Sequence, residues 1–318
     1  MKLSLIIPTL NRPDSLRQCL RSILQSENGP DEIFVVDQST NQDALEKDRD
    51  FCSSITMANW ICTDFQSITK ARNVGMARAN GDVLIFSDDD VTFKPDFFEK
   101  VRLKFNNKDL ALLGTYNLLD PKPKKGLHLF ARLTSYRSFF HKTDGYCTKA
   151  VLGVLPERKR KIADTIWAMG YCFCIRRSVA LQSKLQFDEK MSGYAFNEDL
   201  DFTYRFCAEA RNMGLLCQYQ PNIFVEHHVS QEFRVPSTIF YLAWLGNRYY
   251  LSRKLRIGSK YNIWKTYVAL LMKLNISSQK DAAKNLKEAR RIVKKNIIKI
   301  QKGDLDYKRM LAAKEEPL

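Results

Sequence analysis

Three consecutive aspartates are the first candidates for chemistry in this sequence. Asp88, Asp89 and Asp90 follow Ser87 and, before it, residues 83–86, an apolar run typical of a short buried strand. Adjacent carboxylates repel one another, so a fold keeps them together where a positive group offsets the repulsion. Carboxylates just beyond the carboxyl end of a strand suit Mg²⁺ or Mn²⁺, which also contact substrate phosphates. The alternative interpretation is a solvated acidic turn before a helix that starts near Pro95.

A second acidic cluster lies at residues 197–201, Asn-Glu-Asp-Leu-Asp, where a helix through residue 211 is predicted to begin. Asn197 is a good N-cap, and the helix dipole favours Glu198 and Asp201 in the first turn, which would make the cluster purely structural. A helix N-terminus beside a pocket also suits a carboxylate that acts as a base, and Asp199 is the candidate for that role.

Two of the four histidines, His227 and His228, end a predicted strand at residues 222–228. Adjacent histidines that follow two acidic clusters are better candidates for metal ligands than a lone histidine. Because neighbouring side chains of a strand point to opposite faces, only one of the two should reach a given site.

The elements that must position these residues follow an α/β order. Residues 2–7 and 32–36 are predicted strands, joined by a helix with Asn11 as its cap and Pro13 in its first turn. Such a β-α-β unit implies a parallel pair with a right-handed crossover. Further helices are predicted at 67–80 and 95–105, and further strands at 55–61, 110–113 and 170–175. Residues 117–166 show no clean periodicity, as expected of a functional insertion.

A glycine-rich phosphate loop is absent from the sequence, since neither Gly-x-Gly-x-x-Gly nor a Walker motif occurs. The phosphates of a nucleotide would then need a metal ion in place of a glycine-rich cradle. This favours the metal interpretation of the aspartate triplet.

The positive charge of the chain is concentrated at its C-terminal end. The net charge is +16, and residues 251–318 hold 18 Lys or Arg and six Asp or Glu, leaving about +4 for the first 250 residues. A nucleic-acid enzyme would spread this charge around its working cleft, so no nucleic-acid partner is expected. Apolar residues at helical spacing, including Leu286, Ala289, Ile292 and Val293, predict a basic amphipathic tail that lies on an anionic membrane surface. The alternative is a helical hairpin that packs on the catalytic domain.

Eight scattered cysteines lack metal-finger spacing, and the N-terminus does not resemble a signal peptide. We therefore expect reduced thiols in a cytoplasmic protein. With the basic tail, the predicted location is peripheral, on the inner face of the cell membrane.

Six segments, in this order, resemble the glycosyltransferases of family 2, a nucleotide-sugar-dependent, inverting group with the GT-A fold. They are residues 4–11, 33–37, 71–75, 81–90, 197–201 and 227–230. The resemblance implies an α/β fold with a Rossmann-like, mostly parallel central sheet flanked by helices. It assigns residues 1–235 to the catalytic domain and leaves 236–318 as a basic helical extension.

The resemblance also implies a role for each matching residue. The nucleotide-sugar pocket would be lined by Pro8, Thr9, Asn11, Asp37, Gln38 and Arg72. Asp88 and Asp90 would form an Asp-x-Asp motif that binds Mg²⁺ or Mn²⁺, and Asp89 would lie near the sugar or ribose. Asp199 would be the catalytic base, and His227 or His228 would complete the metal site. Gln38 stands where the family often has a second aspartate that contacts uracil, so the identity of the donor base stays open.

We therefore expect an inverting enzyme that transfers a sugar from a nucleotide-diphosphate sugar to a hydroxyl of a glycan or lipid-linked glycan, as in bacterial surface polysaccharide synthesis. A divalent ion would neutralise the leaving diphosphate, and a carboxylate would take the proton of the attacking hydroxyl. One alternative is a sugar-nucleotide nucleotidyltransferase, which would be expected to carry a glycine-rich phosphate loop. The other is a non-enzymatic basic adaptor for membranes or nucleic acid, which would leave both acidic clusters unexplained.

Overall fold

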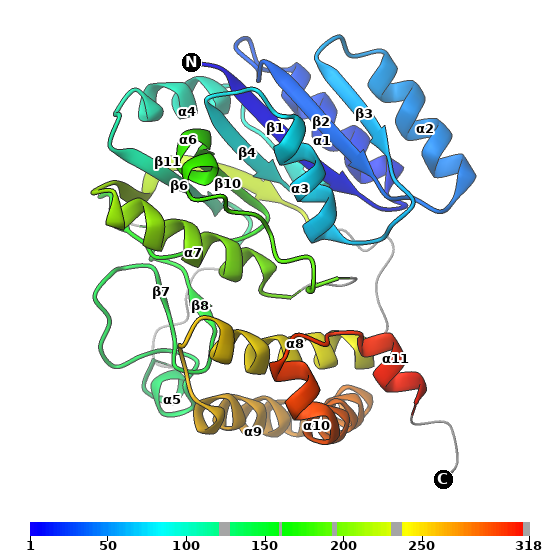
Figure 1. Cartoon of the computed structure of the whole chain (residues 1–318), viewed down its shortest axis with the longest axis vertical. Coiled ribbons are helices and arrows are strands. Elements are labelled where there is room, and N and C mark those ends of the chain that lie inside the picture. The colour runs from blue at the N-terminus through cyan, green and yellow to red at the C-terminus, as the bar shows by residue number, and fades with distance from the viewer. Residues whose placement is uncertain (121–127, 159–160, 193–195, 230–236, 314–318) are drawn as a thin grey trace.

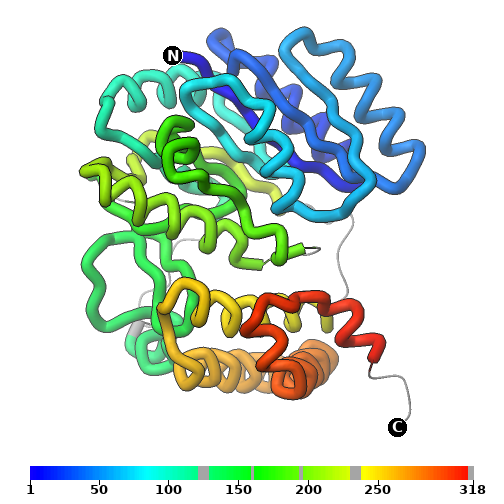
Figure 2. Tube along the Cα trace, in the orientation of Figure 1, coloured from blue at the N-terminus to red at the C-terminus, as the bar shows by residue number. Residues whose placement is uncertain are grey.

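The computed structural model contains a central sheet covered by helices on both faces and a separate layer of C-terminal helices (Figure 1). It describes residues 1–120, 128–158, 161–192, 196–229 and 237–313. The chain begins at the sheet, and its described residues end in the helical layer on the opposite side of the molecule (Figure 2).

The N-terminal half of the sheet is parallel, as the β-α-β reading predicts. Its elements are β1 (Leu3–Thr9), α1 (Pro13–Leu24), β2 (Glu32–Asp37), α2 (Gln42–Ser53), β3 (Ala58–Cys62), α3 (Ile68–Arg78) and β4 (Val83–Ser87). Strand β1 lies between β2 and β4, and Thr9 at its carboxyl end is in register with Asp37 at the end of β2. The loops that follow these strands therefore meet at one edge of the sheet.

The remaining strands complete a mixed sheet among the described residues. They are β5 (Val91–Thr92), β6 (Leu110–Asn117), β9 (Ala163–Asp164), β10 (Cys172–Arg176) and β11 (Leu216–His227), with helix α4 (Phe97–Phe105) between β5 and β6. The strand order is β3-β2-β1-β4-β10-β6-β11-β5, with β9 paired to β11. Strand β10 is antiparallel to both neighbours and so begins at the edge where β4 ends, while β11, which is parallel to β6, ends at that edge.

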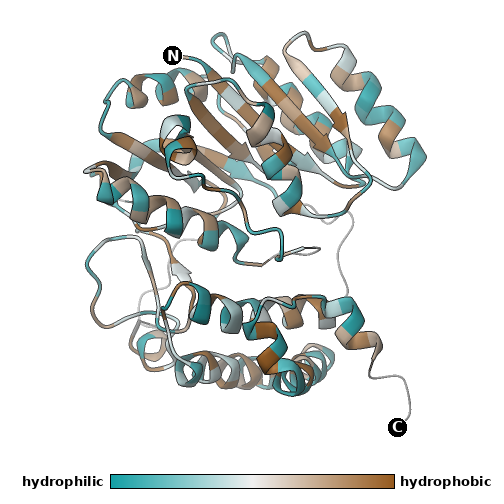
Figure 3. Cartoon of the chain, viewed as in Figure 1, coloured by the Kyte–Doolittle hydropathy of each residue, from teal (hydrophilic) through white to brown (hydrophobic). Residues whose placement is uncertain are grey.

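Two apolar cores hold the helices on the sheet. One core packs α1, α2 and α4 against one face, and the other packs α3, α6 (Arg177–Gln182) and α7 (Glu198–Asn212) against the opposite face. Hydrophobic residues are concentrated along the strands, while the outer faces of the helices are largely hydrophilic (Figure 3). This burial on both faces explains why the strands are continuous apolar runs in the sequence.

Among its described residues, the insertion between β6 and β10 contains only short elements. They are α5 (His128–Leu133), β7 (Tyr146–Cys147), β8 (Gly153–Val154) and the edge strand β9. The sequence expectation of an irregular segment at residues 117–166 agrees with this, apart from residues 117, 163 and 164, which belong to sheet strands.

The C-terminal helices are α8 (Ser237–Lys254), α9 (Lys260–Ile276), α10 (Lys280–Gln301) and α11 (Tyr307–Ala312). They share a third apolar core, to which the insertion contributes Val151 and Trp167. The stripe Leu286, Ala289, Ile292 and Val293 is buried in this core. The prediction that this stripe faces a membrane is therefore wrong, because packing against α8 and α9 already covers it. The proposed domain boundary at residue 235 lies outside the described residues.

None of the helices in the described part of the chain is long and apolar enough to cross a membrane.

The predicted cap at Asn11 is wrong, and the predicted cap at Asn197 holds the N-cap position without a capping hydrogen bond. Asn11 lies before the N-cap of α1, with a positive φ of 55°, and its side chain bonds residues 40 and 41 instead. Asn197 is the N-cap of α7, but its φ is 69° and its side-chain amide donates to the backbone oxygen of Val151. Both side chains fasten neighbouring loops, a tertiary contact that local capping statistics do not contain.

Candidate active site at the carboxyl ends of the strands

A group suited to a metal ion lies where β4 and β11 end. Asp88, Asp90 and His227 each offer one ligand atom, and these atoms all lie within 4.8 Å of one another. His227 Nε2 lies 3.1 Å from Asp90 Oδ1, and its ring stacks on Tyr171. Two carboxylate oxygens and one imidazole nitrogen are a donor set that Mn²⁺ and Mg²⁺ accept, so the residues present fit the expected cofactor.

The two adjacent histidines point in different directions, as strand alternation predicts. His228 Nε2 lies 2.9 Å from the hydroxyl of Thr92, and His228 is not part of the group that contains His227. Thr92 belongs to β5, which pairs with the end of β11. This arrangement favours His227 over His228 as the metal ligand.

The positive group that the aspartate triplet needs is Arg12. Its Nη1 lies 3.2 Å from Asp89 Oδ1 and 3.8 Å from Asp90 Oδ2. Asp89 also accepts a 2.8 Å hydrogen bond from the Thr9 hydroxyl, and burial raises its pKa to about 7 although Arg12 opposes the rise. Asp89 is therefore directed at Thr9 and Arg12. The sequence analysis missed Arg12, for which the only signal was its place in the loop after the first strand.

Arg72 joins the two acidic clusters. It is buried, and its guanidinium donates to Asp88 Oδ1 at 2.9 Å, to Glu198 Oε1 at 3.1 Å and to the backbone oxygen of Gly170 at 3.0 Å. The resemblance places Arg72 on the nucleotide pocket. In this structure its Nη1 and Nη2 atoms are directed at protein oxygens, and one side chain links the residue after β4 with the first turn of α7.

Asp199 is held by backbone groups. Its Oδ2 accepts from the N–H of Gly170 and its Oδ1 from the N–H of Leu200, both at 2.7 Å. Burial raises the pKa of Asp199, while these two donors limit the rise. A Cβ on Gly170 would lie 3.0 Å from Asp199 Cβ, so the close approach depends on glycine. Gly170 was not singled out from the sequence, because nothing marks which glycine will face a carboxylate.

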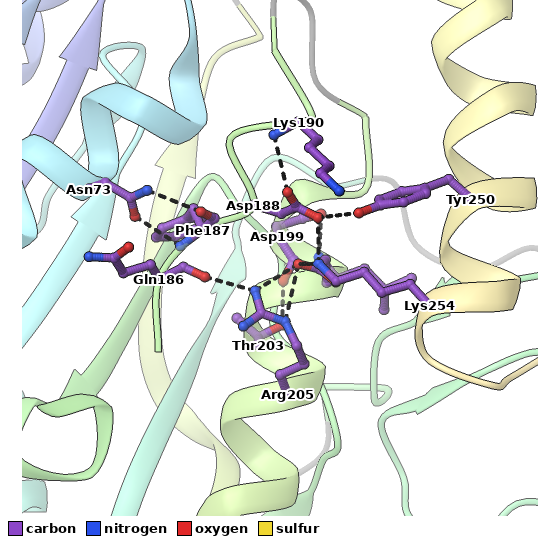
Figure 4. Close-up of polar contacts among 12 residues, drawn as sticks. Asn73, Gln186, Phe187, Asp188, Lys190, Asp199, Thr203, Arg205, Tyr250 and Lys254 are labelled. Carbon is purple, nitrogen blue, oxygen red and sulfur yellow. Dashed lines mark hydrogen bonds and ion pairs between the residues drawn. The ribbon is translucent and has the colours of Figure 1, made fainter. Parts of the chain in front are cut away.

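The acidic neighbours of Asp199 do more than start a helix. Burial, together with the charge of Asp199, raises the pKa of Glu198 to about 8, although Arg72 opposes the shift. Asp201 Oδ2 pairs with Arg205 at 2.7 Å and with Lys254 of α8 at 2.8 Å. Figure 4 shows Lys254 extending from α8 to Asp188 beside Arg205. Asp201 therefore ties α7 to the helical layer.

The residues expected to line the nucleotide pocket hydrogen-bond to one another's loops. The side chain of Asn11 holds the loop after β2 through the N–H groups of Thr40 and Asn41, and Pro8 is buried within β1. Asp37 is buried and accepts from the Ser39 N–H and from Trp60 Nε1.

Gln38 and Asp48 extend this network. Gln38 Oε1 accepts from the Ser67 N–H at 2.5 Å. Burial and the nearby charge of Asp37 raise the pKa of Asp48 to about 8. The sequence did not predict that Asp48 lies beside Asp37. The polar side chains in this region thus fix the loops that surround the strand ends.

Two of the pockets formed by the described residues bear on the site. The smaller, about 150 Å³, is lined by Asp90, Thr92 and His228 together with residues of α1. The larger, about 470 Å³, is formed by the insertion and contains none of the candidate site residues. The smaller pocket therefore adjoins the metal group at Asp90, and the larger pocket is separate from that group.

Comparisons with known proteins agree with this architecture. The family model for Glycosyl transferase family 2 matches residues 4–176. An uncharacterized glycosyltransferase of Haemophilus influenzae is 30% identical over 99 residues, which cover 31% of this chain and 33% of that protein. An uncharacterized glycosyltransferase of Bacillus subtilis is 28% identical over 118 residues, 36% of this chain and 30% of that protein. The matched part spans about a third of the length of each relative.

Solved structures share the fold at low sequence identity. The mannosyltransferase PcManGT from Pyrobaculum calidifontis, in complex with GDP-Man and Mn²⁺, aligns with a TM-score of 0.54 at 12% identity, over 98% of this chain and 86% of that one. S. aureus TarS 1–349 aligns with a TM-score of 0.50 at 15% identity, over 96% and 88%. GalNAc-T7 with UDP, GalNAc and Mn²⁺ has a TM-score of 0.53 at 14% identity, over 74% and 45%. The expected GT-A architecture is confirmed. Because the family model matches more than half of its residues, the chain belongs to glycosyl transferase family 2.

Proposed function

We propose that the chain transfers a sugar from a nucleoside-diphosphate sugar to a hydroxyl of a glycan or lipid-linked glycan, with inversion at the anomeric carbon. The setting would be bacterial surface polysaccharide synthesis. The observation that carries the proposal is that Arg72 bridges a metal-binding type of acidic cluster and a second carboxylate cluster, contacting Asp88 at 2.9 Å and Glu198 at 3.1 Å. Glycosyl transfer needs both a site for the diphosphate and a site for the proton.

The first cluster forms the diphosphate half of the proposed site. Asp88, Asp90 and His227 would hold Mg²⁺ or Mn²⁺, which supplies positive charge against the charge that builds on the leaving diphosphate. Arg12 orients Asp89 and Asp90 and partly offsets the repulsion among the three carboxylates. Four-fifths of the His227 side chain is shielded from solvent, which keeps its ring fixed against Tyr171.

The second cluster forms the proton-accepting half. Asp199 would take the proton of the acceptor hydroxyl while the hydroxyl oxygen attacks the anomeric carbon and the bond to the diphosphate breaks. A single displacement of this kind inverts the carbon. The raised pKa of Asp199 makes its carboxylate a better proton acceptor, and the N–H groups of Gly170 and Leu200 fix its orientation.

The donor nucleotide is the least constrained part of the proposal. The similar structures were solved with GDP-Man and with UDP, so both bases are candidates. Gln38, which replaces the second aspartate expected for uracil, is buried and bonded to Ser67. A panel of nucleotide sugars with Mn²⁺, read by thermal shift, would identify the donor. Release of nucleoside diphosphate, as opposed to pyrophosphate, would separate transfer from the nucleotidyltransferase alternative.

Two substitutions test the assignment of the two halves. Asp90→Ala and Asp199→Asn should each abolish transfer to the acceptor. Only Asp90→Ala should also weaken metal-dependent nucleotide binding, because Asp199 lies outside the ligand group. Matched controls are Asp43→Ala and Asp50→Asn, two exposed carboxylates on α2 that should leave both readouts unchanged. Full activity in Asp90→Ala or Asp199→Asn would refute the proposal.

A further inference from the structure

Two segments that are far apart in sequence and in contact in the fold expose apolar side chains. Phe130, Leu133 and Phe140, in and after α5, are 54%, 56% and 95% exposed. Tyr261, Trp264 and Ile276 of α9 are 62%, 42% and 85% exposed. We call these six residues the α5–α9 face. Large apolar side chains gathered in this way on one surface mark an interaction site more often than scattered ones do.

The two segments form one continuous surface. Lys265 Nζ donates to the backbone oxygen of Leu133 at 3.2 Å, Ser135 donates to Asn262 at 2.6 Å, and the Tyr136 hydroxyl donates to the backbone oxygen of Thr266 at 3.2 Å. In Figure 1, α5 and α9 lie side by side at the lower edge of the molecule, with the sheet on the far side of α8. The two segments that carry the α5–α9 face therefore lie on the side of α8 that is away from the sheet.

Helix α9 has two apolar faces, and within the described residues only one of them is packed against the rest of the protein. Ile263, Tyr267 and Leu274 are buried in the core of the helical layer. Tyr261, Trp264, Met272 and Ile276 recur at spacings of three, four and eight residues, so they share one side of the helix and stay exposed. Packing among the described residues explains why the buried face is apolar. It does not explain why the exposed face is apolar.

The two segments that form this face are both basic. Residues 128–143 contain three Lys or Arg and no Asp or Glu, and residues 259–280 contain four Lys or Arg and no Asp or Glu. The nearest carboxylates along the chain, Asp144 and Asp281, lie just outside the two segments. A symmetric dimer through this face would bring two basic surfaces together, which opposes self-association. An anionic surface complements the face.

We propose that the α5–α9 face rests on a membrane whose surface carries anionic lipids, with α9 parallel to the membrane plane. Trp264 and Tyr261 then lie at the level of the headgroups, and the Lys and Arg of both segments contact lipid phosphates. The orientation directs the helical layer at the bilayer and the sheet away from it. The inference depends on surface residues alone and stands apart from the proposed glycosyl transfer.

Flotation of the whole chain with vesicles of phosphatidylcholine, with and without a third of phosphatidylglycerol, tests the proposal. Binding should be at least about tenfold stronger with the anionic lipid. Phe140→Ser combined with Ile276→Ser should weaken it about tenfold, because the two side chains lose their burial in the interface. Lys265→Gln combined with Lys273→Gln should weaken binding to anionic vesicles by a similar factor, because two charges near the surface are removed.

Matched controls come from the catalytic layer. Leu103→Ser combined with Leu181→Ser changes two residues that are 60% and 58% exposed, and Lys104→Gln combined with Lys108→Gln removes two charges on and after α4. Both double variants should bind vesicles as the unchanged protein does, and thermal unfolding should report any loss of the fold. Quenching of tryptophan fluorescence by brominated lipid should disappear in Trp264→Phe.

Three outcomes would overturn the proposal. One is equal binding to neutral and anionic vesicles. Another is unchanged binding in the Phe140→Ser, Ile276→Ser protein. The third is a dimer in solution, measured by light scattering, that this double substitution converts to a monomer while vesicle binding persists.

Discussion

Both acidic clusters contain aspartates, but they differ in what surrounds them. In the first, Asp88, Asp89 and Asp90 face the side chains of Arg12, Arg72 and His227, and the carboxylate of Asp88 stays 28% exposed. In the second, both oxygens of Asp199 accept hydrogen bonds from backbone N–H groups. A carboxylate cluster that stays partly open to solvent can take up and release a metal ion. Fixed backbone donors suit a carboxylate that must keep one orientation.

The comparison also shows why neither cluster is self-sufficient. Arg72 compensates Asp88 in one cluster and Glu198 in the other, so the charge of each depends on the same buried guanidinium. Carboxylates in a buried site are stable as ions when a paired charge offsets the cost of burial. Arg72 thus couples the metal half of the proposed site to the base half.

Arg72→Met should have the largest effect, because it removes the common partner of both clusters. Loss of one member of a buried ion pair costs about 3–5 kcal/mol, so the free energy of unfolding should fall by that order. Metal affinity and transfer should both be lost. Arg72→Lys is the informative control, because one ammonium cannot make the forked contacts to Asp88, Glu198 and the Gly170 oxygen. Chemical denaturation with metal titration provides the measurement, and retention of both properties in Arg72→Met would refute the coupling.

Sequence reasoning predicted the fold well because the strands are buried on both faces. Runs such as residues 83–86 are apolar without interruption, and the breaks between them carry Pro, Gly or Asp. The antiparallel direction of β10 was not predictable, since an apolar run carries no information about the direction of its neighbours. Helix α2 was missed, because only three of its residues, Ala44, Asp48 and Cys52, are buried.

The site was predictable to the extent that its residues follow strand ends. Asp88, Asp90 and His227 were candidates from their types and positions, and the structure brings them together. Arg12, Gly170 and Asp48 act through contacts between segments that are far apart in sequence, and local patterns do not encode such contacts. The membrane prediction drawn from the apolar stripe of α10 was wrong for a related reason. Amphipathicity shows that a helix has a partner and does not say whether the partner is protein or lipid.

His227→Gln should affect the first cluster and leave the second unchanged. The loss of one ligand nitrogen should weaken Mn²⁺ binding at least about tenfold, with a fall in transfer that added metal partly restores. His228→Gln is the matched control, because its ring contacts Thr92 and lies outside the ligand group. Metal affinity can be measured by titration calorimetry. A larger loss in His228→Gln than in His227→Gln would reverse the assignment of the two histidines.

Gly170→Ala should produce the smallest and most selective effect, confined to the second cluster. The added methyl group would lie 3.0 Å from Asp199 Cβ and 3.2 Å from its Oδ2, so the carboxylate must move by a few tenths of an ångström. A displaced base lowers the rate of the chemical step, here by about tenfold, while leaving ground-state binding of the donor intact. We therefore expect a lower kcat with unchanged KM for the donor and unchanged Mn²⁺ affinity. Gly214→Ala, at a position with open space around the added methyl group, controls for loss of a glycine, although its φ of 74° adds backbone strain. If Gly170→Ala weakened metal binding as much as it lowered kcat, the two clusters would form a single unit, and the division of roles between them would be wrong.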